Sequence, residues 1–332
     1  MNTYLNKNKK IILVSFLLIL SGIFLFLTGA QSESSGKQKE TFYTFQYRDI
    51  YFDITYINKQ KAVIVGSHGL VLVSHSKSPQ LWSQRDSKTT ETLTCISFPD
   101  EKYGWAAGHG GVVINTTDGG ETWAVQRESS PDNQPLFDIK FVSHYIGYAC
   151  GPYETLLKSA DGGKTWMKLS TGMECNYNSL DFYNENVGFA AGEFGTIFKT
   201  VDGGISWRRL YGGGNKGSMF GINILPAGKV LAYGTSGKIL ISWDGGETWI
   251  NVLYPGASEP LFKAAFSGND IAIAGKTGTI LLSNNGGRSF AVKLDADLTS
   301  FTGVCSHPDG GFMFVGEYGK ILKVETLKNE KK

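Results

Sequence analysis

An eight-residue pattern recurs along the chain and constrains its fold more than any other feature. Four copies have the form Ser/Thr-x-Asp-Gly-Gly-x-Ser/Thr-Trp, and a fifth has Asn and Phe in place of Asp and Trp. We call each copy a box, and the boxes are residues 116–123, 159–166, 200–207, 242–249 and 283–290. Their last aromatic residues lie 43, 41, 42 and 41 positions apart, and Trp82 lies 41 positions before the first of them. Such regular spacing predicts a repeat architecture.

A second marker gives the number of repeats. A glycine returns at intervals of 41 to 43 residues, and in all but one case another glycine follows three positions later, the exception being Glu154. These marker glycines are Gly66, Gly108, Gly151, Gly192, Gly234, Gly275 and Gly316. Seven units are therefore expected.

Within one unit the hydrophobic pattern is that of short strands. Residues 93–98, 104–108, 112–116 and 122–127 are rich in β-branched and aromatic residues, are separated by turn residues and lack a helical period. Four strands in about 42 residues are typical of a propeller blade. The sequence predicts an all-β, seven-bladed β-propeller of four-stranded antiparallel blades over residues 41–325.

The last unit lacks a strand. It runs from Phe301 to Val324 and has no box, and only the charged tail 326–332 follows the propeller. Residues 41–48 alternate aromatic and polar side chains ahead of the first complete unit. We expect this segment to pair as the outer strand of the last blade, which would close the ring and cover a sheet edge.

The amino terminus indicates export. Three lysines precede an apolar run over residues 11–28, and a polar linker follows over residues 31–40. Residues 1–30 are predicted to be a signal peptide or a membrane-anchoring helix, with a small-residue cleavage site at residues 28–30. The remainder would lie outside the cytoplasm, in the periplasm or an equivalent space, where the membrane is within reach.

Charge argues against a polyanionic partner. The chain has 32 Lys and Arg against 30 Asp and Glu, and loss of residues 1–30 removes three lysines and leaves a net charge of −1. A nucleic-acid binder usually carries a strongly basic balance. We therefore expect no nucleic-acid partner.

Each box is expected to be a self-contained turn between the third and fourth strands. Its Asp can accept hydrogen bonds from backbone amides of the turn, its glycines supply positive φ, and its terminal aromatic ring can pack against a neighbouring blade. These structural residues are Asp118, Trp123, Asp161, Trp166, Asp202, Trp207, Asp244, Trp249, Asn285 and Phe290.

The opposite face carries the turns between second and third strands and the connections between blades. Its innermost ring is expected to be the dipeptides after the marker glycines, which vary while their frame is constant. Variable tips on a constant frame suit a binding surface, although unconstrained tips would vary too, and exposed aromatic residues favour interfaces. The candidate partner-binding residues are His68, His109, Tyr153, Glu193, Phe194, Lys276, Glu317 and Tyr318.

Catalysis is the alternative. A glycosidase needs two carboxylates across a cleft, and Glu193 and Glu317 are the pair to test. The six arginines do not form the triad that a sialidase would use. His68, His109, His144 and His307 lie in different units without metal-binding spacing. We expect no cofactor, no metal and a monomer.

The boxes, the period near 42 and the seven units resemble BNR/Asp-box propellers. Phrases such as Tyr-Gly-Trp-Ala-Ala-Gly at residues 103–108 and Val-Gly-Phe-Ala-Ala-Gly at residues 187–192 are similar to the photosystem II stability/assembly factor family. That resemblance covers about residues 41–325. It implies a non-enzymatic scaffold that docks on membrane-protein subunits or their exported loops; an exported, sialidase-like glycosidase is the other reading of the boxes. The family resemblance implies an arginine-rich patch on the propeller. The tip dipeptides of this chain contain no arginine, and their one lysine is Lys276.

Overall fold

The computed structural model describes residues 42–75, 78–213, 217–256 and 258–327, without the side chains of residues 75 and 78–80. The predicted signal or anchor segment 1–30, the linker 31–40 and residues 328–332 of the tail lie outside these ranges. The chain divides into two units, Met1–Glu40 and Thr41–Lys332, and the second is described here.

The first four sheets each contain four antiparallel strands that follow the chain order. They are β1 (Tyr51–Asn58), β2 (Lys61–Gly66), β3 (Val71–His75) and β4 (Ser78–Arg85); β5 (Leu93–Ser97), β6 (Gly104–Gly108), β7 (Val113–Thr116) and β8 (Ala124–Arg127); β9 (Asp138–Phe141), β10 (Gly147–Cys150), β11 (Leu156–Ser159) and β12 (Met167–Lys168); and β13 (Tyr177–Phe182), β14 (Gly188–Gly192), β15 (Ile197–Thr200) and β16 (Arg208–Tyr211).

Three further sheets complete the ring. They are β17 (Met219–Ile224), β18 (Val230–Gly234), β19 (Ile239–Ser242) and β20 (Ile250–Asn251); β21 (Leu261–Ser267), β22 (Asp270–Gly275), β23 (Thr279–Ser283) and β24 (Ala291–Leu294); and β25 (Phe301–Ser306), β26 (Phe312–Gly316) and β27 (Ile321–Val324). The helical elements of the described residues are short 3-10 turns, η1 (Ser67–Gly69), η2 (His109–Gly111), η3 (Glu193–Gly195), η4 (Pro226–Gly228), η5 (Thr235–Gly237) and η6 (Glu317–Gly319). Among these residues no helix is long and apolar enough to cross a membrane. The predicted all-β, seven-bladed propeller is confirmed.

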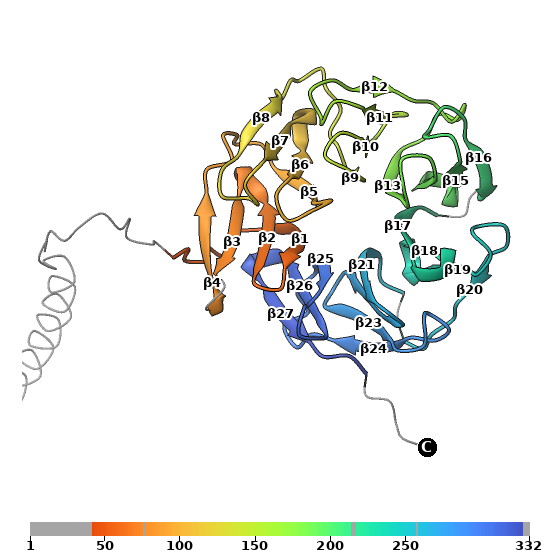
Figure 1. The fold of residues 1–332 in the computed structure, drawn as a ribbon. Helices are drawn as coiled ribbons and strands as arrows, with labels where there is room; N and C mark the ends of the chain where they lie inside the picture. Colours follow the sequence, from red (N-terminus) through yellow and green to blue (C-terminus); the bar gives the residue numbers. More distant parts are fainter. Residues whose placement is uncertain (1–41, 76–77, 214–216, 257, 328–332) are drawn as a thin grey trace, which may run out of the picture. The chain divides into compact units, whose positions relative to one another are not determined.

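The first strand of each blade lies nearest the central axis and the fourth lies at the rim (Figure 1). The boxes and the loops between first and second strands are therefore on one face, which we call the box face. The turns between second and third strands, the blade connections and the lead-in segment 42–50 are on the other, which we call the turn face. This connectivity decides which residues can meet at each end of the central channel.

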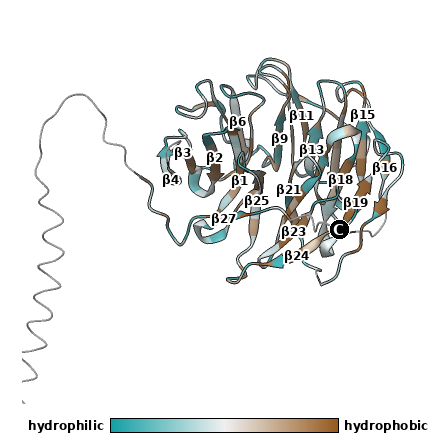
Figure 2. Ribbon diagram, turned by 60° about the horizontal axis from the view of Figure 1, so that its bottom comes forward, coloured by the Kyte–Doolittle hydropathy of each residue, from teal (hydrophilic) through white to brown (hydrophobic). Residues whose placement is uncertain are grey.

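Apolar layers between adjacent blades form the core. Between the first two blades, for example, Val63 and Val73 pack with Leu93, Ile114 and the box residue Trp123, and all five side chains are buried. Residues coloured as hydrophobic follow strands such as β19 and β23 in Figure 2. Burial of each such aliphatic side chain contributes about 1.5–3 kcal/mol, so the layers between blades are the main stabilising contacts.

The prediction of a closing outer strand is wrong. Residues 42–48 form no strand, and the sheet of β25, β26 and β27 has three strands. A turn held by Asp49, whose carboxylate accepts hydrogen bonds from the Tyr43 hydroxyl and the Gln46 amide, redirects the segment. The Tyr43 amide then donates to the carbonyl of Trp82 in the first blade. The ring closes instead by side-chain packing, because Met313 and Val315 share an apolar layer with residues of the first blade.

The marker glycines have a steric reason. At Gly108 an added Cβ would lie 1.9 Å from the carbonyl oxygen of Thr92, in the connection that leads into the same blade. That carbonyl accepts a hydrogen bond from the His109 amide. The absence of a side chain therefore lets the connection rest directly on the turn between second and third strands.

Each box is tied by its own hydrogen bonds. The Asp161 carboxylate accepts from the amide and the hydroxyl of Thr165 and from the Ser159 hydroxyl, while the Trp166 indole donates to the Gly163 carbonyl. The Thr165 hydroxyl and amide lower the pKa of Asp161 to about 2, and matching bonds lower the pKa values of Asp202 and Asp244 to about 2. The carboxylates are thus ionised parts of the turns.

Replacing Asp161 should destabilise the third blade. In Asp161→Ala the Thr165 amide and two hydroxyls lose their acceptor, which should cost about 1–3 kcal/mol of unfolding free energy. Asp161→Asn is the matched control, because Asn285 makes the corresponding bonds to Ser283 and Ser289 in the fifth box. Urea unfolding of the three proteins measures the effect. Equal stability of wild type and Asp161→Ala would contradict the structural role.

The same carboxylates predict a pH dependence. A carboxylate whose pKa is lower in the folded state contributes stability above its unfolded pKa, and that contribution is lost as pH falls through the folded pKa. The advantage of wild type over Asp161→Asn should therefore shrink between about pH 4 and pH 2. Thermal unfolding of both proteins at a series of pH values tests this, and a difference that stays constant down to pH 2 would oppose it.

Candidate functional site

The turn tips present side chains on a strained but repeated backbone. The second residue after every marker glycine has a positive φ, between 51° at Tyr153 and 59° at Gly110. Flanking hydrogen bonds hold this conformation; at Phe194, for example, the neighbouring Glu193 and Thr196 amides donate to Asn176 and Glu193 carbonyls. Left-handed non-glycine residues cost of order 1–3 kcal/mol and persist only where the surroundings fix them. The frame is therefore rigid.

The structure distributes the eight candidate residues over six blades of the turn face. Tyr153, Phe194 and Tyr318 are 73%, 45% and 52% exposed, and His68, His109 and Lys276 are also exposed. Tyr318 stacks on Tyr47 of the lead-in segment, with ring centroids 4.6 Å apart. The candidates surround the axis rather than converge on one point.

Glu193 and Glu317 belong to the fourth and seventh blades and each serves its own blade. A carboxylate oxygen of Glu193 accepts from the Asn176 amide at 3.1 Å, and one of Glu317 accepts from the Ser300 amide at 3.3 Å. Both carboxylates thus hold connections between blades. This arrangement gives no support to their use as a catalytic pair.

The sequence pattern predicts that the tip dipeptides form the innermost ring of the turn face, and this prediction is wrong. Second and third strands lie farther from the axis than the first strand, and neighbouring strands are about 4.8 Å apart. The residues nearest the axis lie instead at the beginning of each first strand. They are Phe52, Thr94, Phe137, Asn178, Phe220, Phe262 and Thr302.

These seven residues occupy equivalent positions. In six blades the residue interrupts the register between first and second strands as a β-bulge, and in the third blade Phe137 immediately precedes β9. A bulge redirects a side chain out of the regular alternation. Together the seven surround a hollow of about 310 Å³ at the turn-face end of the channel. We call this hollow the socket.

The sequence carries a signal for the socket in the spacing of its residues from the marker glycines. In six units its residue lies 14 positions before the marker glycine, and in the sixth unit 13 positions before it. The resulting column, Phe, Thr, Phe, Asn, Phe, Phe, Thr, contains four phenylalanines that a half-buried strand end does not require. Reading the units as aligned columns would have found it.

The three polar socket residues are engaged with neighbouring blades. The Thr94 hydroxyl donates to the Leu136 carbonyl, the Asn178 amide donates to the Met219 carbonyl, and the Thr302 hydroxyl donates to the Tyr51 carbonyl. The four phenylalanines form the apolar part. Phe137 is 37% exposed, and the rings of Phe220 and Phe262 have centroids 6.0 Å apart.

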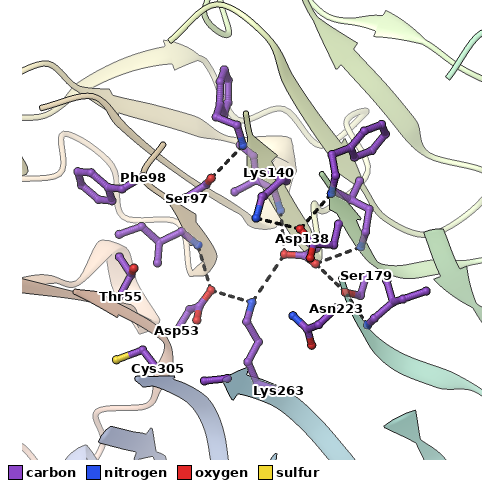
Figure 3. A pocket seen from close by; sticks show the side chains of 18 of the residues that line it. Asp53, Thr55, Ser97, Phe98, Asp138, Lys140, Ser179, Asn223, Lys263 and Cys305 are labelled. Carbon is purple, nitrogen blue, oxygen red and sulfur yellow. Dashed lines mark hydrogen bonds and ion pairs between the residues drawn. The ribbon is translucent and has the colours of Figure 1, made fainter. Parts of the chain in front are cut away.

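Charged residues form the floor of the socket. Lys263 of β21 lies 2.9 Å from an Asp53 carboxylate oxygen and 3.7 Å from one of Asp138, so it connects three blades across the axis (Figure 3). Burial alone would lower the pKa of Lys263, but the two carboxylates raise that pKa well above its ordinary value. The lysine is therefore charged and serves as a brace.

A second hollow, of about 550 Å³, lies on the other side of this floor, toward the box face. It shares Asp138, Ser179 and Lys263 with the socket, and its walls include Lys140 and Asp181, which form an ion pair of 2.9 Å. Carboxylates of the first strands also accept hydrogen bonds from backbone amides of the next blade. Asp53 accepts from the Ile96 amide, and Asp181 accepts from the Ile224 amide. We call these inner-strand contacts the belt. The polar groups of the belt are used in ion pairs and hydrogen bonds between blades.

The turn face is acidic. Within its turns, its blade connections and the lead-in segment, the described basic residues are Arg48, Lys88, Lys238, Lys276 and Lys320. The described acidic residues of the same segments are Asp49, Asp86, Glu91, Glu128, Asp132, Glu154, Glu174, Glu193, Glu259, Asp295, Asp297 and Glu317. Lys88 and Lys320 pair with acidic residues of this face. Two basic residues of outer strands also reach it, because Arg127 donates to the Gly111 carbonyl and to Asn133, and Lys168 pairs with Glu154. No group of three or more metal-binding side chains occurs in the described part of the chain.

Solved structures show the same fold. A structure described as "YCF48 bound to D1 peptide" superposes with a TM-score of 0.69 at 19% identity, covering 89% of this chain and 100% of the other. "YCF48 from Cyanidioschyzon merolae" gives 0.66 at 16% identity, covering 84% and 96%. The WD40 propeller domain of Doa1 gives 0.67 at 14%, covering 87% and 96%, so these similarities establish architecture alone.

Sequence comparison establishes the family. No curated protein matches the chain. The sequence profile of the family described as "Photosynthesis system II assembly factor YCF48" matches residues 32–130 and 125–249, which is well over half of the chain. The chain belongs to the photosynthesis system II assembly factor YCF48 family.

Proposed function

We propose that this protein is an exported, non-enzymatic scaffold that holds a segment of a membrane-protein subunit during photosystem II assembly. Family membership supports the class of function. One solved YCF48 structure is described as bound to a D1 peptide, which makes a peptide segment the natural form of the ligand.

The observation that carries the proposed binding surface is the joint position of exposed aromatic tips and the socket on one face. Tyr153 and Phe194 are exposed on turns of the turn face. The socket opens on the same face and is surrounded by one residue from each blade. Aromatic side chains on a preorganised frame bind with little loss of conformational entropy. The turn face therefore suits a partner better than the self-satisfied boxes do.

The apolar amino-terminal segment supports the proposed location. Residues 11–28 follow three lysines, a pattern that directs export and keeps the preceding residues in the cytoplasm. Whether cleaved or retained, this segment would deliver the propeller to the outer side of the cytoplasmic membrane. A membrane-protein subunit or its exported loop would be in reach there.

Removing two tip aromatics should weaken binding of the D1 peptide by about a hundredfold, because two interface aromatics contribute several kcal/mol. The variant is Tyr153→Gly with Phe194→Gly, since the second blade already has Gly110 at the equivalent positive-φ position. Fluorescence anisotropy with labelled peptide and full-length protein gives the affinity.

The matched control changes exposed apolar residues of the box face. Tyr183 and Ile205 are 74% and 80% exposed, and Tyr183→Ala with Ile205→Ala should leave peptide affinity unchanged. Thermal unfolding verifies that both variants keep the fold. Unchanged binding by the tip variant together with lost binding by the control would move the site to the box face.

A further inference from the structure

We propose that the socket receives a single apolar side chain of an extended, basic segment of the partner. This inference rests on the proposed function, because it assigns the chemistry of the ligand on the turn face. The socket, which is formed by one residue from each blade, would be a second contact site beside the exposed tips.

The direction of the socket side chains is the first argument. The bulges turn Phe52, Phe220 and Phe262 out of the strand alternation and toward the channel end, where Phe137 joins them. The core layers between blades do not contain these four side chains. Their partly exposed rings face a hollow, so an apolar group that enters would cover them.

Size and floor limit what can enter. The volume of about 310 Å³ is at the lower end of ligand pockets, and it suits one large side chain. A helix has a diameter of about 10 Å with its side chains and would need a groove. The Lys263 brace closes the socket below, which prevents passage of a chain through the ring.

Charge selects the residues that flank the apolar side chain. Among the described residues of the turn-face segments, acidic residues still outnumber basic ones after Lys88, Lys320 and the carboxylates that pair with them are set aside. A segment with lysines or arginines on both sides of the apolar residue would meet an attractive field around the socket. An acidic segment would be repelled.

The test uses three nine-residue peptides, acetylated, amidated and fluorescently labelled, with the full-length protein at low ionic strength. The first has one central leucine between two pairs of lysines in a Gly/Ser background. The second replaces leucine with serine, and the third replaces the lysines with glutamates. Because burial of leucine contributes about 1.5–3 kcal/mol, the first should bind at least tenfold more tightly than the second. The third should bind least.

Protein variants locate the effect. Phe137→Ala with Phe220→Ala should abolish the preference for leucine over serine while leaving the affinity for the serine peptide unchanged. Phe137 is 37% exposed, so Phe137→Lys should weaken binding of the leucine peptide without removing core packing. Tyr183→Ala on the box face is the control and should change neither value.

Equal affinity of wild type for the leucine and serine peptides would overturn the proposal, as would a preference that survives both socket variants. The D1 peptide separates this failure from failure of the proposed function. If the tip variant loses D1 peptide and the socket variants bind it normally, the binding face stands and the socket assignment is wrong. If neither set affects D1 peptide, both proposals are wrong.

Discussion

Closure of the ring by apolar packing is the contact on which the rest of the molecule depends. The seventh blade ends at β27 and has no fourth strand, yet Met313 and Val315 join Ile64 and Leu72 of the first blade in a buried layer. With that layer in place each blade is covered on both sides. Without it, two apolar sheet faces would meet water, and the seven first strands would not surround a common axis.

Ring closure also creates the charged belt. Lys263 of the sixth blade can reach Asp53 of the first and Asp138 of the third only because the first strands meet around the channel. The two carboxylates also accept hydrogen bonds from backbone amides of neighbouring blades, Asp53 from Ile96 and Asp138 from Leu180. Their negative charges are therefore balanced by Lys263 and by these amides. Lys263 keeps 29% of its side chain exposed, and partial burial of its charge between two carboxylates costs desolvation that offsets much of their attraction, so this ion pair adds little net stability.

The two faces differ in what their polar groups do. On the box face the Asp carboxylates are used within their own turns, as the depressed pKa values of Asp161, Asp202 and Asp244 indicate. On the turn face the backbone supplies the frame, because connection carbonyls rest on the marker glycines and bond the tips. The exposed side chains of Tyr153 and Phe194 are therefore not needed to hold the frame.

The sequence by itself determined the repeats, the number of blades, the box turns and the assignment of tips to one face, because each follows from local spacing and turn chemistry. It did not determine how residues 42–48 run, since an alternating pattern alone does not reveal that Asp49 bends the segment toward Trp82. The socket was also decided by tertiary structure. Phe52 and Phe262 are far apart in the chain, and only the bulges and the closed ring direct their side chains into one hollow.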